Sequence, residues 1–196
     1  MSHIRRISAL LTCLSLVALL VSACGGSSEL RPYKTALLDS APSGAVLESS
    51  LDSELGTLLA KYTAVFSDGA VSVEYERDSL TEYEDGTAGS GEITSSEGSY
   101  SRSADGAVTG EISPLVLALL TRALNLSDEL IAYPAVSEDG TLTFSVTAEN
   151  TEAVFGTPIG YGVSCKITLS EKRITVIELS YTAASGEARL KCEYGY

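Results

Sequence analysis

Few side chains in this sequence of 196 residues are of the types that enzymes use as nucleophiles or proton carriers. There are four cysteines, at positions 13, 24, 165 and 192, and the only histidine is His3. Catalytic triads and thiol nucleophiles commonly need an imidazole partner, and many zinc and iron sites use histidine ligands. The sequence therefore predicts no catalytic residue, no metal site, no cofactor and no enzymatic activity.

One of these cysteines, Cys24, follows a segment with the features of an export signal. Arg5 and Arg6 give a basic start, and residues 7–21 are apolar or small. This run of about 15 residues is shorter than the roughly 20 that span a bilayer as a helix. We therefore expect a cleaved signal rather than a transmembrane helix. An ordinary signal that happens to contain a cysteine is the alternative to a lipid-attachment signal.

The quartet Val21-Ser22-Ala23-Cys24 resembles the lipobox of bacterial lipoproteins. The resemblance implies that residues 1–23 are a lipoprotein signal peptide and that the Cys24 thiol carries a lipid, which anchors the protein to the membrane. Residues 24–44 contain several Gly, Ser and Pro residues, and we expect them to form the lipidated cysteine and a flexible tether. Residues 45–196 then form one domain. The expected location is extracytoplasmic, on the cell membrane.

The charge balance restricts the partners of the mature chain. The sequence has 13 Lys and Arg residues and 26 Asp and Glu residues. Removal of residues 1–23 takes away Arg5 and Arg6 and no acidic residue, which leaves 11 basic residues and a formal charge of −15. Because no basic cluster remains to neutralise phosphates, nucleic-acid binding is not expected. Solubility alone explains the acidic excess.

Two segments have helical periodicity. In residues 46–66, apolar residues recur at steps of three and four, and Ser67-Asp68-Gly69 follows them as a helix end. The second helix is expected over residues 114–126, with Ser113 as its cap and Pro114 at its first position. This helix is apolar nearly all round, so either a further layer of chain covers it or part of it faces a cavity.

The remaining segments favour antiparallel strands. Apolar and polar residues alternate in residues 71–76, more weakly in 91–95 and 99–103, and then in four strands between residues 142 and 194. The expected hairpins place Cys165 opposite Leu179 and Leu179 opposite Cys192. The two thiols would then flank a central strand, about 10 Å apart. A disulfide needs Cα atoms within about 7 Å, so we expect two free, buried thiols and keep a disulfide as the alternative.

The order of a helix, a run of strands, an apolar helix and a four-strand meander behind a lipobox resembles the LolA/LppX class of bacterial envelope proteins. The resemblance implies an α+β domain in which a curved antiparallel sheet of about seven strands packs around two main helices as a half-barrel. It also implies a cavity for a lipid-like or other apolar ligand. The expected cavity-lining residues are Leu115, Leu117, Leu119, Leu120, Leu124, Tyr161 and Tyr181. The alternative function is a non-enzymatic accessory protein that binds another envelope protein.

Overall fold

The described part of the chain is dominated by one large antiparallel sheet. The structure, a computed structural model, describes residues 29–39, 41–83 and 90–196. Cys24 lies outside these residues. The elements in chain order are α2 (Arg31–Leu38), β1 (Gly44–Ser53), β2 (Gly56–Ser67), β3 (Ala70–Glu82), β4 (Gly91–Arg102), β5 (Val108–Thr109), α3 (Pro114–Thr121), β6 (Ala132–Val136), β7 (Thr141–Val146), η1 (Ala148–Asn150), α4 (Thr151–Phe155), β8 (Tyr161–Ser170), β9 (Arg173–Ala183) and β10 (Gly186–Gly195).

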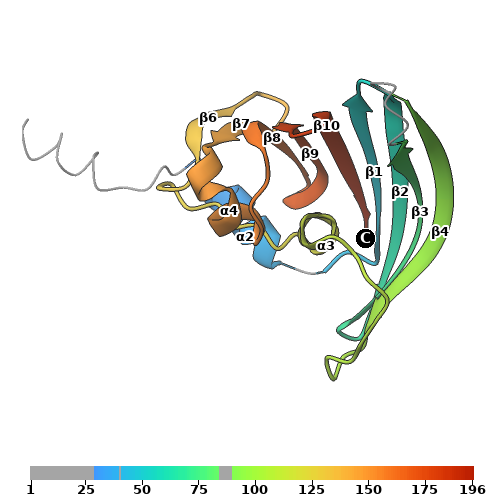
Figure 1. Ribbon diagram of the computed structural model, residues 1–196. Helices are drawn as coiled ribbons and strands as arrows, with labels where there is room; N and C mark the ends of the chain where they lie inside the picture. Colours follow the sequence, from blue (N-terminus) through green and yellow to red (C-terminus); the bar gives the residue numbers. More distant parts are fainter. Residues whose placement is uncertain (1–28, 40, 84–89) are drawn as a thin grey trace, which may run out of the picture.

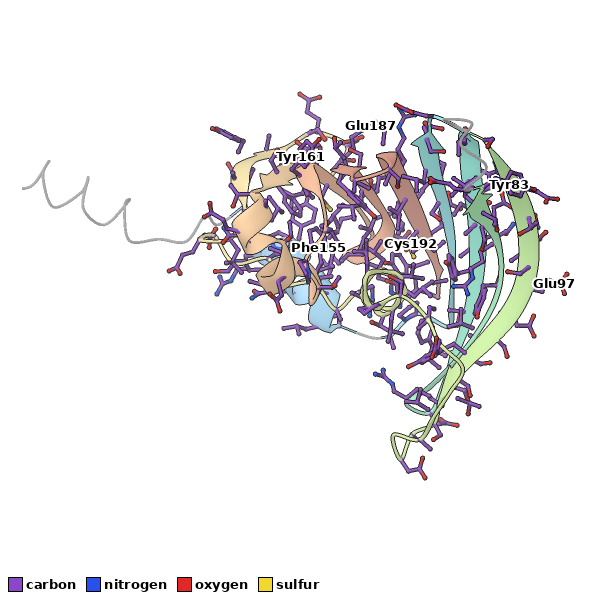
Figure 2. The ribbon with its side chains drawn as sticks, in the orientation of Figure 1. Tyr83, Glu97, Phe155, Tyr161, Glu187 and Cys192 are labelled. Carbon is purple, nitrogen blue, oxygen red and sulfur yellow. The ribbon has the colours of Figure 1, made fainter. Side chains whose placement is uncertain are left out.

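Two meanders are joined edge to edge in this sheet. The strand order is β5-β4-β3-β2-β1-β10-β9-β8-β7-β6, and β1 joins the two halves by pairing with β10, with Leu47 opposite Cys192. Figure 1 shows that the sheet is curved and that α2, α3 and α4 lie along its concave side. The core fills the space between them, where Leu47, Phe155 and Ile177 are fully buried (Figure 2 labels Phe155).

The expected fold class was wrong in its balance of strands and helices. The described residues form ten strands and three short α-helices, not about seven strands around two main helices. The largest error is the helix expected over residues 46–66, which form the hairpin of β1 and β2. A repeat of four residues fits both periods, because four residues are about one helical turn and also two full repeats of a strand. The hairpin turn at Glu54-Leu55 was missed because neither residue is typical of a turn. The only glycine beside it is Gly56, at φ 137°.

The second expected helix is shorter than the sequence indicated. Helix α3 ends at Thr121, and Arg122 follows in the left-handed conformation at φ 57°. Leu124 therefore lies outside the helix. Residues 128–130 form only a turn, and Pro134 falls inside the edge strand β6. An edge strand tolerates proline because one side of its backbone makes no ladder hydrogen bonds.

Part of the expected tether is folded onto the domain. Residues 31–38 form α2, in which Tyr33 and Ala36 are buried. The Tyr33 hydroxyl donates to the carbonyl oxygen of Gly140 at 3.0 Å, and Lys34 forms an ion pair of 2.8 Å with Asp128. These contacts join α2 to the C-terminal half of the sheet.

The C-terminal meander follows the expected pattern with one shift of register. Cys165 lies opposite Leu179, as expected. Leu179, however, pairs with Leu190, and Cys192 pairs with Ile177. The shift arises because the turn between β9 and β10 consists of Ala184 and Ser185, whereas Ser185-Gly186 was expected. Both thiols are buried and free, on opposite sides of β9, which confirms the expectation of no disulfide between them.

A candidate ligand-binding hollow

Helix α3 is held against the concave face mainly through its C-terminal half. The hydroxyl of Tyr194, on β10, donates to the carbonyl oxygen of Leu119. After the helix, the Arg122 guanidinium donates to the carbonyl oxygens of Ala36 and Asp39, each at 3.0 Å. Arg122 thereby ties the end of α3 to the end of α2. The N-terminal half of α3 carries no comparable polar anchor, since Ser113 makes no side-chain capping hydrogen bond.

A hollow of about 240 Å³ lies beside this N-terminal half, and we call it the inner hollow. It extends over the concave face of β2, β1, β10 and β9. Leu115 and Val116 of α3 line one side of it. The sheet contributes the inner-face residues Leu51, Leu58, Ala60, Tyr181, Ala188 and Leu190. Its lining is therefore mostly apolar.

A second, wider depression of about 800 Å³ adjoins the inner hollow at the end of the sheet, and we call it the rim depression. It is bordered by the β1–β2 turn, the β9–β10 turn and the beginning of β8. Ala183 lines both spaces, so they meet at this residue. Tyr161 and Tyr83 lie at the rim (Figure 2), with exposed fractions of 64% and 47%.

The expected cavity-lining residues divide into two groups. Leu115 and Tyr181 line the inner hollow, and Tyr161 lines the rim depression. Leu119 and Leu120 are fully buried in the packed core, and Leu117 and Leu124 are half-buried against it. The structure therefore does not bring these four leucines to either space.

Sequence reasoning missed most of the sheet residues of the inner hollow. Leu51, Leu58 and Ala60 were assigned to a helix, so they were not recognised as one face of a hairpin. A period-two pattern was available to find them, since Leu58, Ala60, Tyr62 and Ala64 all face inward on β2. It was obscured by the leucines that also fit a helical period.

The charged groups of the inner hollow are few. Arg77 lies 5.3 Å from the ring centroid of Tyr75, and Tyr75 in turn packs against Tyr62 at 5.6 Å. Asp78 accepts hydrogen bonds from the Ser95 hydroxyl and the Leu59 amide, which lower the pKa of its carboxyl. Burial raises the pKa of the Tyr181 phenol. It also raises the pKa of Tyr62, against the opposing effect of Arg77. Both phenols are therefore neutral at physiological pH.

The two buried cysteines do not contribute a reactive group. Burial raises the pKa of the Cys165 thiol far above its ordinary value and raises that of Cys192 to about 12. The thiolate is the nucleophilic form, and at neutral pH neither residue supplies it.

Within the described ranges, no three His, Cys, Asp or Glu side chains are grouped so that they could hold a metal ion. In the same ranges, no helix is long and apolar enough to cross a membrane.

Comparison with protein-family models gives no match, and comparison with curated proteins gives none.

Proposed function

We propose that this protein is a membrane-anchored extracytoplasmic lipoprotein that binds a lipid-like or other apolar ligand in the inner hollow. The observation that carries the proposal is the unfilled, mostly apolar space between the N-terminal half of α3 and the concave face of the sheet. Protein interiors are normally packed as densely as organic crystals. The inner hollow leaves about 240 Å³ beside α3 unpacked, and its mostly apolar lining favours an apolar occupant.

The size and shape of the space favour a narrow ligand. Sites for small molecules usually measure about 300–1,000 Å³. The inner hollow is slightly smaller, and the rim depression adds about 800 Å³ beyond Ala183. An alkyl chain fits this description, because it can extend from Leu115 past Ala183 towards the surface. Leu51 and Leu58 are half-buried, and covering their exposed apolar surface would contribute about 25 cal/mol per Å².

The proposed anchor would keep this site close to a source of lipid. Only four residues lie between Cys24 and Glu29, the first described residue, so five Cα-to-Cα steps join the two. A fully extended chain spans at most about 3.6 Å per residue, so this segment reaches roughly 18 Å. Helix α2 begins two residues later and packs on the domain. A domain so close to the membrane surface would meet lipid without a long diffusional search.

We also propose that the protein binds its ligand without catalysing a reaction. The chain has no histidine after His3, and its two buried thiols are protonated at neutral pH. Hydrolysis or acyl transfer would require another nucleophile and base. Arg77 and Asp78 are the charged residues of the inner hollow, and the hydrogen bonds from Ser95 and the Leu59 amide that lower the pKa of Asp78 make its carboxylate a weaker base and nucleophile.

The experiment compares two phenylalanine substitutions on β2. Ala60→Phe places a ring in the inner hollow, whereas Val65→Phe places one on the exposed outer face of the same strand. The full chain is purified in a non-ionic detergent, and non-covalently bound lipid is quantified by native mass spectrometry. We expect ligand bound to the parent and to Val65→Phe and strongly reduced in Ala60→Phe. Equal retention in all three proteins would refute the inner hollow as the site.

A second candidate function rests on the edge of the sheet. Strand β5 pairs only with Ser101 and Arg102, so Gly91–Tyr100 of β4 has no strand partner on that side among the described residues. An open edge can pair with a strand of another protein. This arrangement favours the accessory role if the parent protein carries no ligand.

A further inference from the structure

A further pocket lies at the C-terminal end of α3, the end away from the inner hollow, and three arginines line it. It has a volume of about 520 Å³, and we call it the arginine pocket. Arg102 comes from the end of β4, Arg122 follows α3, and Arg173 begins β9. Thr121 and Tyr196 also line the pocket, as do the backbone and side chains of the Ser67–Ala70 turn.

The concentration of positive charge here is unusual for this chain. Residues 24–196 carry a formal charge of −15 and contain six arginines, of which three line this one pocket. Asp68 is the one carboxylate among the side chains that line it. Within the described ranges, all four ion pairs are made by lysines, so neither Arg102 nor Arg173 has a carboxylate within 4.0 Å. Like charges that line one pocket repel each other, and an anion bound between them would offset this repulsion.

Aromatic and backbone contacts hold part of this cluster in place. Arg122 is only 5% exposed, and its guanidinium donates to the Tyr196 hydroxyl at 3.1 Å. Two guanidinium groups lie near the Tyr196 ring. The distance to the ring centroid is 5.9 Å for Arg122 and 4.9 Å for Arg173. The Tyr196 hydroxyl in turn donates to the carbonyl oxygen of Ile174 at 2.8 Å. Arg122 therefore supplies a fixed buried charge, while the exposed side chains of Arg102 and Arg173 can donate hydrogen bonds.

We propose that the arginine pocket binds a phosphate group. Guanidinium groups donate two parallel hydrogen bonds to phosphate oxygens, and a tetrahedral phosphate offers several oxygens to more than one arginine. A carboxylate has only two oxygens and one charge, so it offers fewer acceptors and less charge than a phosphate. Two donor arginines and a third fixed charge match the phosphate better. The group belongs either to a lipid headgroup or to a soluble phosphate compound.

This inference does not depend on the ligand of the inner hollow. The two spaces share no lining residue: the inner hollow adjoins Leu115 and Val116, and the arginine pocket adjoins Thr121 and Arg122. Loss of binding at one site would leave the geometry of the other unchanged.

The experiment uses the full chain in a non-ionic detergent and measures binding by isothermal titration calorimetry. Inorganic phosphate and dihexanoyl phosphatidylglycerol serve as the two probes. The variants are Arg102→Gln and Arg173→Gln, with Arg189→Gln as control, because Arg189 is exposed on the outer face of β10. Loss of one charge-assisted hydrogen bond should weaken binding about tenfold or more in each pocket variant. The control should bind as the parent does.

The two probes distinguish the source of the phosphate group. Tighter binding of inorganic phosphate supports a soluble phosphate compound, and tighter binding of the short-chain lipid supports a headgroup. Either result supports the arginine pocket only if Arg102→Gln and Arg173→Gln weaken the binding of that probe. The proposal is overturned if the parent binds neither probe at millimolar concentration. It is also overturned if all three variants weaken binding equally, since that result indicates a general effect of surface charge.

Discussion

Leu115 and Leu119 lie one turn apart on α3 but differ in what surrounds them, so alanine at each position should have a different cost. Removing about three carbons from a buried leucine costs about 2.4 kcal/mol through lost transfer free energy alone. At Leu119, which is fully buried in the packed core, the new cavity adds to this loss. We expect a total of about 4 kcal/mol, within the usual range of about 2–5 kcal/mol. Leu115 is also buried, at 5% exposed, but its removed atoms border the inner hollow, so we expect little beyond the transfer loss of about 2.4 kcal/mol.

The measurement is urea unfolding followed by far-ultraviolet circular dichroism, with a reducing agent present to keep the thiols free. Both variants should unfold with the slope of the parent, so that a shift of midpoint reports stability. Leu115→Ala should also reduce retention of any co-purified apolar ligand, whereas Leu119→Ala should not do so at temperatures where it remains folded. Equal losses of stability at the two positions, together with no ligand in the parent, would mean a uniformly packed helix. That result would refute the inner hollow as a binding site.

Four further outcomes are expected. Cys165 and Cys192 should not react with a thiol reagent in the native protein and should both react after unfolding. Because the folded pKa of Cys192 is raised from 9.0 to about 12, the folded state holds its proton more tightly, and measured stability should fall as pH rises from about 9 towards 12. Cys24→Ala should abolish incorporation of labelled fatty acid; normal labelling would contradict the lipobox interpretation. Tyr194→Phe should cost about 1 kcal/mol in urea unfolding, because the Leu119 carbonyl keeps its bond from the Arg122 amide; an unchanged midpoint would contradict this role.

The C-terminal meander was the part of the fold that the sequence predicted best. Its strands are bounded by clear turns, and the alternation is regular in β10 and in β7, as in Leu142, Phe144 and Val146. The β8–β9 turn places Glu171 and Lys172 at φ 51° and 66°, as a two-residue hairpin turn requires. The register beyond β9 was missed because two overlapping dipeptides can each form the next turn. Choosing the wrong dipeptide moves the partner of every residue by two positions.

The N-terminal meander was harder to predict because its strands are unevenly buried. On β4, almost every side chain is exposed, so the alternation that identifies a half-buried strand is weak. Tyr100 is its buried residue, and Gly98 faces the ring of Tyr75.

The arginine pocket was not predictable for a different reason. Arg102, Arg122 and Arg173 are far apart in sequence and on three different elements, and only the closure of the sheet at β1 and β10 brings them together.

The apolar character of α3 on nearly all sides has two explanations, and each applies to a different part of the helix. At the C-terminal end a further layer of chain covers the helix: α4 packs against it, and Arg122 joins its end to α2. Leu119 and Leu120 are fully buried there. At the N-terminal end no such layer follows, and Leu115 and Val116 face the inner hollow instead. The same run of leucines thus supplies the packed core at one end and an apolar wall at the other, so a binding site here costs the fold little of its stability.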